Sequence, residues 1–393
     1  MIARKLTERS AHATGTLCAA ARDASPSAAW ATPEDTRAGR SGGPVVGRLA
    51  PSPTGLLHLG NAWAFLLAWL SARSQGGRIL LRMEDLDPQR SRPEFAAAIV
   101  EDLQWLGLDW DAGPETDDDP LPERLTAQVP PLATGARAPG IFSHGAPGSL
   151  IQSRRAPVYA AALARLESAG LTYPCFCSRK ELRQLASAPH PGEEGPAAPD
   201  PCRLLSPEER QRLLAAGRHA SLRLRCPESA VSFTDVLLGP QCFSPADYGG
   251  DFALRRSDGV VAYQLAVAVD DGLMGVTEVV RGRDLVPSTP RQLLVMRALG
   301  LAAPRYAHIP LLLDAAGERL AKRHASLSLA ALRSRGVPPE RVVGYLARLA
   351  GINPVGAPVR PQALTGRFSP GALPRDDLRV MEEDVERLTG APL

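Results

Sequence analysis

The sequence has few cysteines and no long apolar run, and each scarcity excludes a class of protein. Six cysteines in 393 residues are too few for a disulfide scaffold, which favours a reducing compartment. The longest apolar helical stretch, 62–70, is far too short to span a bilayer, and no secretory signal opens the chain. A net charge of only +3 neither requires nor excludes a nucleic-acid partner. We therefore expect a soluble, cytoplasmic protein without a membrane partner.

Composition and periodicity divide the chain into segments. Buried strands alternate with amphipathic helices on both sides of a middle region, which is typical of a nucleotide-binding α/β sheet. The acidic residues Glu8, Asp23, Glu34 and Asp35 argue against a transit peptide, whereas an early start codon would explain the unpatterned first segment as well as disorder does. The predicted segments are 1–43 (disordered leader), 44–172 (first half of the sheet, with an irregular insertion at 113–149), 173–250 (inserted α/β subdomain), 251–325 (second half of the sheet) and 326–393 (helical C-terminal region).

A turn near the start of the sheet carries the first functional signal. The segment from Gly47 to Asn61 joins a short apolar strand to an apolar helix over 62–74, with Asn61 as the expected N-cap. Gly60 would let a ligand approach the backbone, and the positive end of the helix favours a phosphate chain. His58 can donate hydrogen bonds to phosphate oxygens. The same spacing also fits an ordinary strand, turn and helix with a packed histidine.

The remaining pattern places polar residues at the ends of further strands. Glu84 follows one predicted strand and Arg281 follows another, at the edge where doubly wound sheets bind ligands. The acidic residues within 84–87 more commonly form a solvent-exposed turn without a ligand. The other predicted elements are strands 78–83, 276–280 and 308–313, a helix over 93–106 capped by Ser91, a helix over 157–168, a helix capped by Ser288 or Thr289 that stops at Gly300, and helices over 330–335 and 339–350, with no pattern after Pro354.

Three thiols form a candidate metal site in the middle region. Cys175 and Cys177 lie on one side of a short extended segment, and Cys202 follows them. Three thiolates could hold Zn²⁺, which takes four ligands in a structural site. The fourth ligand is unknown, and a lone C-x-C pair is weak evidence. Zinc and simple packing both remain open from spacing alone.

Two motifs resemble those of class I aminoacyl-tRNA synthetases of the glutamyl type. Residues 51–60, Pro-Ser-Pro-Thr-Gly-Leu-Leu-His-Leu-Gly, are similar to the HIGH motif in its glutamyl setting, and 319–323, Arg-Leu-Ala-Lys-Arg, are similar to the KMSKS loop. The sequences of segments 251–267 and 281–285 are most similar to the corresponding segments of the truncated paralogues that glutamylate tRNA(Asp). The resemblance covers about 45–353, apart from the insertion, and its combined motifs are specific.

The resemblance implies a fold, a reaction and site residues. It implies a Rossmann catalytic domain that activates L-glutamate with ATP and Mg²⁺ and transfers glutamate to the queuosine base in the anticodon of tRNA(Asp). It implies catalytic roles for His58 and Lys322, and an ATP site of His58, Gly60, Asn61 and Lys322. The glutamate pocket implied by the resemblance is Arg48, Leu49, Ala50, Pro51, Ser52, Glu84, Tyr263 and Arg281. Guanidinium groups suit the two carboxylates and Glu84 suits the α-ammonium.

Two departures from the family pattern bear on these expectations. Ala321 replaces the serine of the KMSKS-like loop, and Arg319 replaces its first lysine, which could weaken loop closure without removing the charge of Lys322. In the family a tyrosine completes the zinc site, and the position that corresponds to it here is Ala198. We keep Cys175, Cys177 and Cys202 as metal candidates.

Alternative functions remain open at this stage. The segment after Lys322 is too short for a full anticodon-binding domain, so we expect the truncated form and a monomer rather than a glutamyl-tRNA synthetase that charges tRNA(Glu). A non-catalytic RNA-binding paralogue would explain Ala321. An adenylate-forming ligase for another carboxylate would share the HIGH motif, although Arg48, Glu84 and Arg281 together favour a dicarboxylic amino acid.

Overall fold

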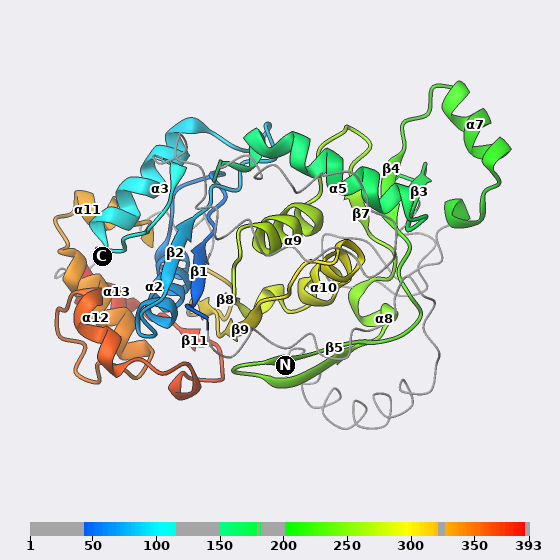
Figure 1. Ribbon diagram of the computed structural model, residues 1–393. Helices are drawn as coiled ribbons and strands as arrows, with labels where there is room; N and C mark the ends of the chain where they lie inside the picture. Colours follow the sequence, from blue (N-terminus) through cyan, green and yellow to red (C-terminus); the bar gives the residue numbers. More distant parts are fainter. Residues whose placement is uncertain (1–42, 115–148, 179–180, 182–200, 321–326, 390–393) are drawn as a thin grey trace.

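The computed structural model describes residues 43–114, 149–178, 181, 201–320 and 327–389. Two sets of parallel strands meet at its centre (Figure 1). Strand β1 (Val46–Leu49) pairs with β2 (Arg78–Leu81), while β9 (Arg305–Ile309) pairs with both β8 (Glu278–Gly282) and β5 (Val231–Asp235). Thr277 links the sets, because its N–H donates to the carbonyl oxygen of Val46 at 2.9 Å. This parallel sheet, flanked by helices, confirms the predicted α/β fold of the Rossmann type.

Helix α2 (Leu59–Arg73) is buried because it is apolar on most of its surface. It packs against β1 and β8, and its two tryptophans, Trp63 and Trp69, are almost fully buried. On the other side, α9 (Tyr263–Leu273) packs against α10 (Ser288–Leu299). The helices near the parallel strands also include α3 (Pro93–Trp105) and α5 (Ala156–Ser168), with short 3₁₀ turns at Gln152–Arg155 and Arg283–Leu285.

The predicted N-cap residues of α2, α3 and α10 were wrong, although the three helices were predicted correctly. Helix α2 begins at Leu59 and its N-cap is His58, whereas Asn61 lies inside the first turn and its Oδ1 accepts the His58 N–H at 3.0 Å. Helix α3 has Arg92 rather than Ser91 as its N-cap, and α10 has Pro287. Gly300 ends α10 as predicted, with a φ of 67° that favours glycine.

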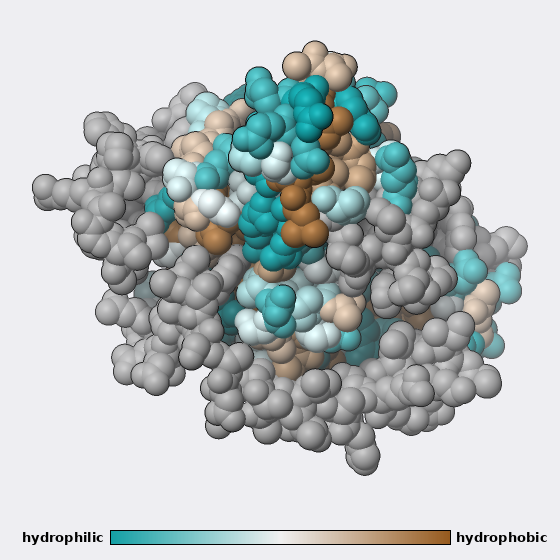
Figure 2. Space-filling model, turned by 90° about the vertical axis from the view of Figure 1, so that its right-hand side faces the viewer, coloured by the Kyte–Doolittle hydropathy of each residue, from teal (hydrophilic) through white to brown (hydrophobic). Residues whose placement is uncertain are grey.

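The middle region contributes to two sheets. Strands β3 (Thr172–Cys175), β4 (Ser221–Leu224) and β7 (Ala253–Arg255) form an antiparallel sheet. The hairpin of β5 and β6 (Gly239–Phe243) instead joins the parallel strands β8 and β9, because β5 pairs with β9. Helix α7 (Pro207–Ala215) projects at the end of the molecule opposite α12 and α13, and α8 (Pro245–Tyr248) lies between (Figure 1). Figure 2 looks onto the α7 end, where mostly hydrophilic side chains border a narrow apolar streak.

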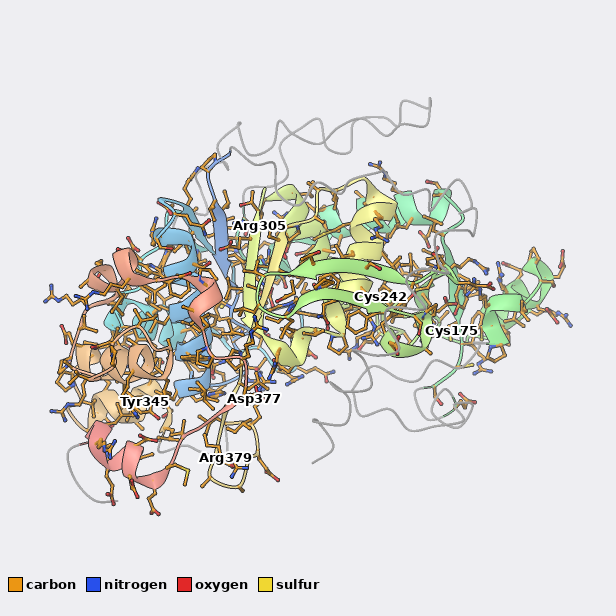
Figure 3. All side chains as sticks on the ribbon, turned by 90° about the horizontal axis from the view of Figure 1, so that it is seen from below. Cys175, Cys242, Arg305, Tyr345, Asp377 and Arg379 are labelled. Atoms are coloured by element: carbon orange, nitrogen blue, oxygen red, sulfur yellow. The ribbon has the colours of Figure 1, made fainter. Side chains whose placement is uncertain are left out.

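The C-terminal region is more ordered than its sequence suggested. Helices α11 (Leu329–Ser334) and α12 (Pro339–Leu349) were predicted, but β11 (Leu378–Arg379) and α13 (Glu382–Thr389) were not. Strand β11 pairs in parallel with β10 (Leu312–Leu313), and Asp377 accepts the Leu311 N–H at 2.8 Å. Asp377 and Arg379 therefore lie beside the base of the 314–327 loop, far from Cys175 (Figure 3).

Several expectations concern residues outside the described part of the chain. The predicted leader and nearly all of the predicted insertion belong to this group, as do Ala198, Ala321 and Lys322. Among the described residues, every helix is too short or too polar to cross a bilayer.

Candidate active site

A cavity of about 390 Å³ opens where β1 and β8 end and α2 begins. The sequence-predicted residues that line it are Arg48, Ala50, Pro51, Ser52, His58, Gly60, Asn61, Glu84, Tyr263 and Arg281. The side chain of Leu49 lies instead in the hydrophobic core beneath the cavity. Its carbonyl oxygen accepts the Arg82 N–H at 2.8 Å, which ties the cavity wall to the neighbouring strand.

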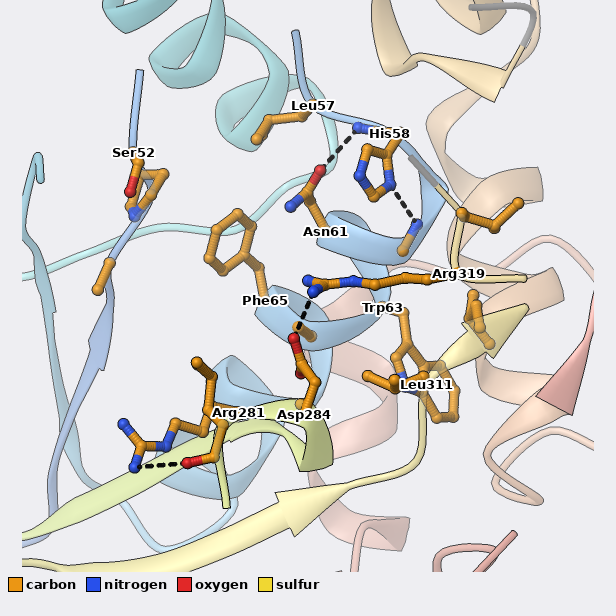
Figure 4. Close-up of a pocket in the computed structure, with 18 of the residues that line it drawn as sticks. Ser52, Leu57, His58, Asn61, Trp63, Phe65, Arg281, Asp284, Leu311 and Arg319 are labelled. Carbon is orange, nitrogen blue, oxygen red and sulfur yellow. Dashed lines mark hydrogen bonds and ion pairs between the residues drawn. The ribbon is translucent and has the colours of Figure 1, made fainter. Parts of the chain in front are cut away.

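The turn before α2 holds the imidazole of His58 in one orientation. Nδ1 of His58 accepts the N–H of Gly60 at 3.1 Å (Figure 4). A Cβ atom on residue 60 would lie only 3.1 Å from the imidazole ring, so the absence of a side chain at Gly60 leaves room for the ring. Because Nδ1 is an acceptor, the neutral ring carries its hydrogen on Nε2. The N–H of Gly60 is therefore engaged within the turn, and Nε2 of His58 is a donor that the turn can offer a phosphate.

A buried chain of charges lies behind the glutamate-pocket candidates. Arg82 donates to Glu84 at 3.0 Å and to Asp271 at 2.7 Å, and Nε of Arg48 lies 3.7 Å from Asp271. Burial lowers the pKa of Arg82, but Asp271, Glu84 and Asp270 outweigh it and raise that pKa well above its usual value. Burial raises the pKa of Glu84, against the opposing effect of Arg82. The chain alternates in sign, so Arg48 and Glu84 each have a fixed opposite charge behind them.

Sequence reasoning missed Arg82 and the two aspartates of α9. Asp270 accepts hydrogen bonds from Arg155 at 2.7 Å, and from Gln152 and Tyr159 at 2.8 Å each. These residues are fully or almost fully buried. Charged residues inside otherwise apolar strands and helices rarely occur without a partner, and that was the available signal.

The guanidinium of Arg281 is already engaged by protein groups. It donates to His308, Gln292 and Thr289 at 2.8 to 3.1 Å, and to the Leu285 carbonyl oxygen at 3.4 Å. Arg48 donates to the Val280 carbonyl oxygen at 3.2 Å. Both arginines line the cavity, but their orientations are set by the protein scaffold.

A second cavity of about 740 Å³ adjoins the first. Ser52, Thr54, Glu84 and Tyr263 line both cavities. Burial, followed by the charge of Glu84, raises the pKa of Tyr263 to about 12, so its hydroxyl is a neutral donor at physiological pH. The far wall of the second cavity includes Arg256, which pairs with Asp87 at 3.2 Å. Tyr263 therefore stands between two connected spaces.

The described ends of the 314–327 loop adjoin the first cavity. Arg319 pairs with Asp284 across the cavity, close to Asn61 and Phe65 (Figure 4). At the other end, the N–H of Leu329 donates to the Leu57 carbonyl oxygen at 2.9 Å. Arg319 and Leu320, which precede the part of the loop outside the described residues, thus line the same cavity as the turn that holds His58.

The three predicted metal ligands come together in the structure. Sγ atoms of Cys175, Cys177 and Cys202 all lie within 4.8 Å of one another, and those of Cys177 and Cys202 are 3.6 Å apart. Three thiolates on one tetrahedral Zn²⁺, with Zn–S bonds of about 2.3 Å, would be about 3.8 Å apart. The Phe176 N–H donates to Cys202 Sγ at 3.4 Å, which fixes the position of that sulfur beside the other two. The geometry fits a zinc ion with one further ligand.

Comparisons with known proteins show the family of the chain. Residues 44–358 match the family model described as tRNA synthetases class I (E and Q), catalytic domain. The chain is 52% identical to the glutamyl-Q tRNA(Asp) synthetase of Nitratidesulfovibrio vulgaris over 88% of this chain and 98% of that protein. It is 48% identical to the glutamyl-Q tRNA(Asp) synthetase of Symbiobacterium thermophilum over 88% of this chain and 99% of that protein.

A solved structure is similar as well. The crystal structure of a glutamate tRNA ligase from Elizabethkingia meningosepticum, in complex with its amino acid, superposes with a TM-score of 0.68. The sequences are 26% identical, over 88% of this chain and 68% of that one. The chain therefore belongs to the class I tRNA synthetases of the E and Q type, and it is a ligase.

Proposed function

We propose that this protein activates L-glutamate with ATP and transfers the glutamyl group to the queuosine base in the anticodon of tRNA(Asp). One observation carries the proposal: Arg48, Glu84 and Tyr263 converge on the cavity that His58 borders, and this cavity adjoins a second one. An acidic amino acid and a triphosphate can lie end to end there. The near full-length likeness to two glutamyl-Q tRNA(Asp) synthetases supports the choice of acceptor.

In the first step an oxygen of the glutamate α-carboxylate attacks the α-phosphorus of ATP. The bond to the β-phosphate oxygen breaks, and pyrophosphate leaves with the electron pair. Because no protein nucleophile is needed, the protein acts by orientation and by stabilising negative charge. We assign the phosphate contacts to Nε2 of His58, to the side-chain amide of Asn61, and to Lys322, with Gly60 as part of the adjoining cavity wall. Mg²⁺ bound with ATP would neutralise further phosphate charge.

Recognition of glutamate falls to the buried charges of the first cavity. Glu84 is the acceptor for the α-ammonium, and Arg82 keeps it oriented at 3.0 Å. Arg48 and Arg281 offer guanidinium donors to the side-chain carboxylate, with Ala50, Pro51 and Ser52 as the adjoining wall. The backbone of Leu49 contributes through its place in β1.

In the second step a hydroxyl oxygen of the queuosine base attacks the carbonyl carbon of the adenylate. The ester forms, the bond to the AMP oxygen breaks, and the hydroxyl proton leaves to solvent or to the departing phosphate. We assign the acceptor to the second cavity, because Tyr263 and Glu84 line both spaces. Cys175, Cys177 and Cys202 would hold a zinc ion that stiffens the neighbouring wall, where Cys177 lies. A monomer in the cytoplasm, where tRNA is available, completes the proposal.

The principal alternative is an enzyme that charges tRNA(Glu), as the name of the similar solved ligase suggests for that protein. Labelled glutamate and ATP, offered to tRNA(Asp) with and without queuosine and to tRNA(Glu), separate the two. We expect ATP–pyrophosphate exchange with glutamate and labelling of queuosine-containing tRNA(Asp) alone. Labelling of tRNA(Glu), or of tRNA(Asp) without queuosine, would overturn the proposed acceptor. Folded protein without exchange would favour an RNA-binding role, and exchange with another carboxylate in place of glutamate would favour a different adenylate-forming ligase.

A further inference from the structure

Arg281 is held by a buried network that the proposed reaction does not use. Its Nε–H donates to Nε2 of His308 at 3.1 Å, and its two terminal nitrogens donate to Gln292 at 2.9 Å and Thr289 at 2.8 Å. The ring of Tyr306 lies 5.2 Å beneath the guanidinium. Arg281 is only 4% exposed. Its direction is therefore decided by residues of β9 and α10 before any substrate arrives.

His308 can serve Arg281 in only one protonation state. Nε of an arginine is always a donor, so Nε2 of His308 must be the acceptor and must lack a hydrogen. The ring hydrogen is then on Nδ1, which donates to Oδ2 of Asp235 at 2.6 Å. Burial, reinforced by the charge of Arg281, lowers the pKa of His308 to about 4, against the opposing effect of Asp235. The neutral Nδ1–H form satisfies Asp235 and Arg281, and its Nε2 can also accept from the Thr289 hydroxyl, which lies 3.2 Å away.

Asp235 is fixed in turn by the backbone at the end of β5. Its Oδ1 accepts the N–H groups of Leu237 and Leu238 at 2.9 Å each. Its Oδ2 accepts the His308 N–H at 3.1 Å in addition to the ring. Asp235 stands opposite Tyr306 where β5 joins β9, and it is 2% exposed. Oδ1 also accepts the His308 N–H at 3.3 Å, so Oδ1 alone accepts from the turn amides and Oδ2 alone accepts from the His308 ring.

We propose that Asp235 and His308 are positioning residues that fix Arg281 for recognition of the glutamate side-chain carboxylate. Asp235 selects the tautomer of His308, and that tautomer orients the Nε edge of Arg281. The inference rests on the proposed function, because it requires glutamate to contact Arg281. It also gives the β5–β6 hairpin of the middle region a part in amino-acid selection.

Asp235→Asn tests the tautomer step with almost no change of shape. The turn amides of Leu237 and Leu238 require an oxygen, so the new amide nitrogen must face Nδ1 of His308. That nitrogen is a donor, so His308 must move its hydrogen to Nε2, where it opposes the Nε–H of Arg281. We expect the KM for glutamate in ATP–pyrophosphate exchange to rise at least about fivefold, on the scale of one lost hydrogen bond to a charged group. The KM for ATP should stay within about twofold.

Two further variants separate positioning from general loss of stability. In Asp235→Asn combined with His308→Gln, the glutamine oxygen can accept from Arg281 whatever occupies position 235, so the KM for glutamate should recover. His308→Asn keeps a donor to Asp235 but removes the acceptor for Arg281, and it should reproduce the defect even if Asp235→Asn does not fold. Asp102→Asn, a buried aspartate that lines neither cavity, is the matched control and should leave both KM values unchanged.

The outcomes distinguish this inference from the proposed function. Wild-type protein that shows no glutamate-dependent exchange would remove the proposed function and the inference with it. Normal exchange by wild type, with an unchanged KM for glutamate in folded Asp235→Asn or His308→Asn, would overturn the inference alone. Equal rises in the KM values for glutamate and ATP would also contradict it, since that result would indicate general distortion.

Discussion

Arg319 and Asp284 form an ion pair across the opening of the first cavity, between the 314–327 loop and the segment after β8. The Arg319 side chain is 59% exposed, so water and salt weaken the pair. We expect Asp284→Asn to reduce adenylate formation by no more than about threefold, on the scale of an exposed pair. The effect should shrink as salt increases. A tenfold loss that salt does not change would mean that Asp284 contacts substrate.

The neighbouring Lys322 lies outside the described residues, and its role stays a prediction from the sequence. Lys322→Ala should slow adenylate formation at least about tenfold, the scale of removing one donor that stabilises transition-state charge. Lys322→Arg, which keeps the charge, should retain more activity. Exchange kinetics with glutamate and ATP measure both variants. An unchanged rate in Lys322→Ala would contradict the assigned role.

Arg82 should matter for both stability and substrate binding. It is fully buried between Glu84 and Asp271, so Arg82→Met would leave Glu84 without its ion pair and Asp271 with only the more distant Arg48. Breaking a buried pair in this way costs about 3–5 kcal/mol of unfolding free energy. Urea unfolding should show this loss. If the variant is as stable as wild type, the two carboxylates take up protons or find other partners.

The sequence predicted the cavity better than it predicted the contacts inside it. Apolar patterns located β1, β2 and α2, and the family motifs indicated that Arg48, Glu84 and Arg281 would lie close together. The structure places all three in the lining of one cavity. Local propensity could not identify the cap of α2, because Asn61 is favourable both as an N-cap and inside a capping box.

Contacts between residues far apart in the sequence could not be predicted from local sequence patterns. Arg82 and Asp271 meet although 189 positions separate them, and Arg281 reaches partners on two other elements. Strand β11 is only two residues long, and its place beside β10 depends on that tertiary contact. The Cys175, Cys177 and Cys202 cluster was predicted from the C-x-C spacing and the family resemblance, and the structure brings its three sulfurs together.

That cluster predicts a measurable metal content. Purified protein should contain about one zinc ion per chain, since three thiolates at this spacing suit a tetrahedral site. Cys202→Ala should lose the metal, whereas Cys242→Ala, on β6 and outside the cluster, should retain it. Elemental analysis after dialysis measures both. Wild-type protein without zinc would show that these thiols only pack together.

Asp102 should make the protein less stable as pH rises through the acidic range. It is fully buried on α3, and among the described residues neither of its carboxylate oxygens accepts a hydrogen bond. Burial raises its pKa from 3.8 to about 6, although Arg333 opposes the shift. Below the unfolded value the group is neutral in both states and costs nothing. Above it the unfolded chain releases the proton more readily, so the folded state loses stability until about pH 6.

Asp102→Asn removes this titration. The advantage of the variant in unfolding free energy should therefore grow by about 1–2 kcal/mol between about pH 4.5 and pH 7, because each pKa unit corresponds to about 1.4 kcal/mol. Arg333 keeps its pairing with Glu101 at 3.0 Å, so the substitution leaves that cation a partner. Denaturant unfolding of both proteins across the pH range tests the sign. A constant difference would mean that water or Arg333 already stabilises the ionised carboxylate, and a difference that shrinks toward neutral pH would mean that its folded pKa is depressed.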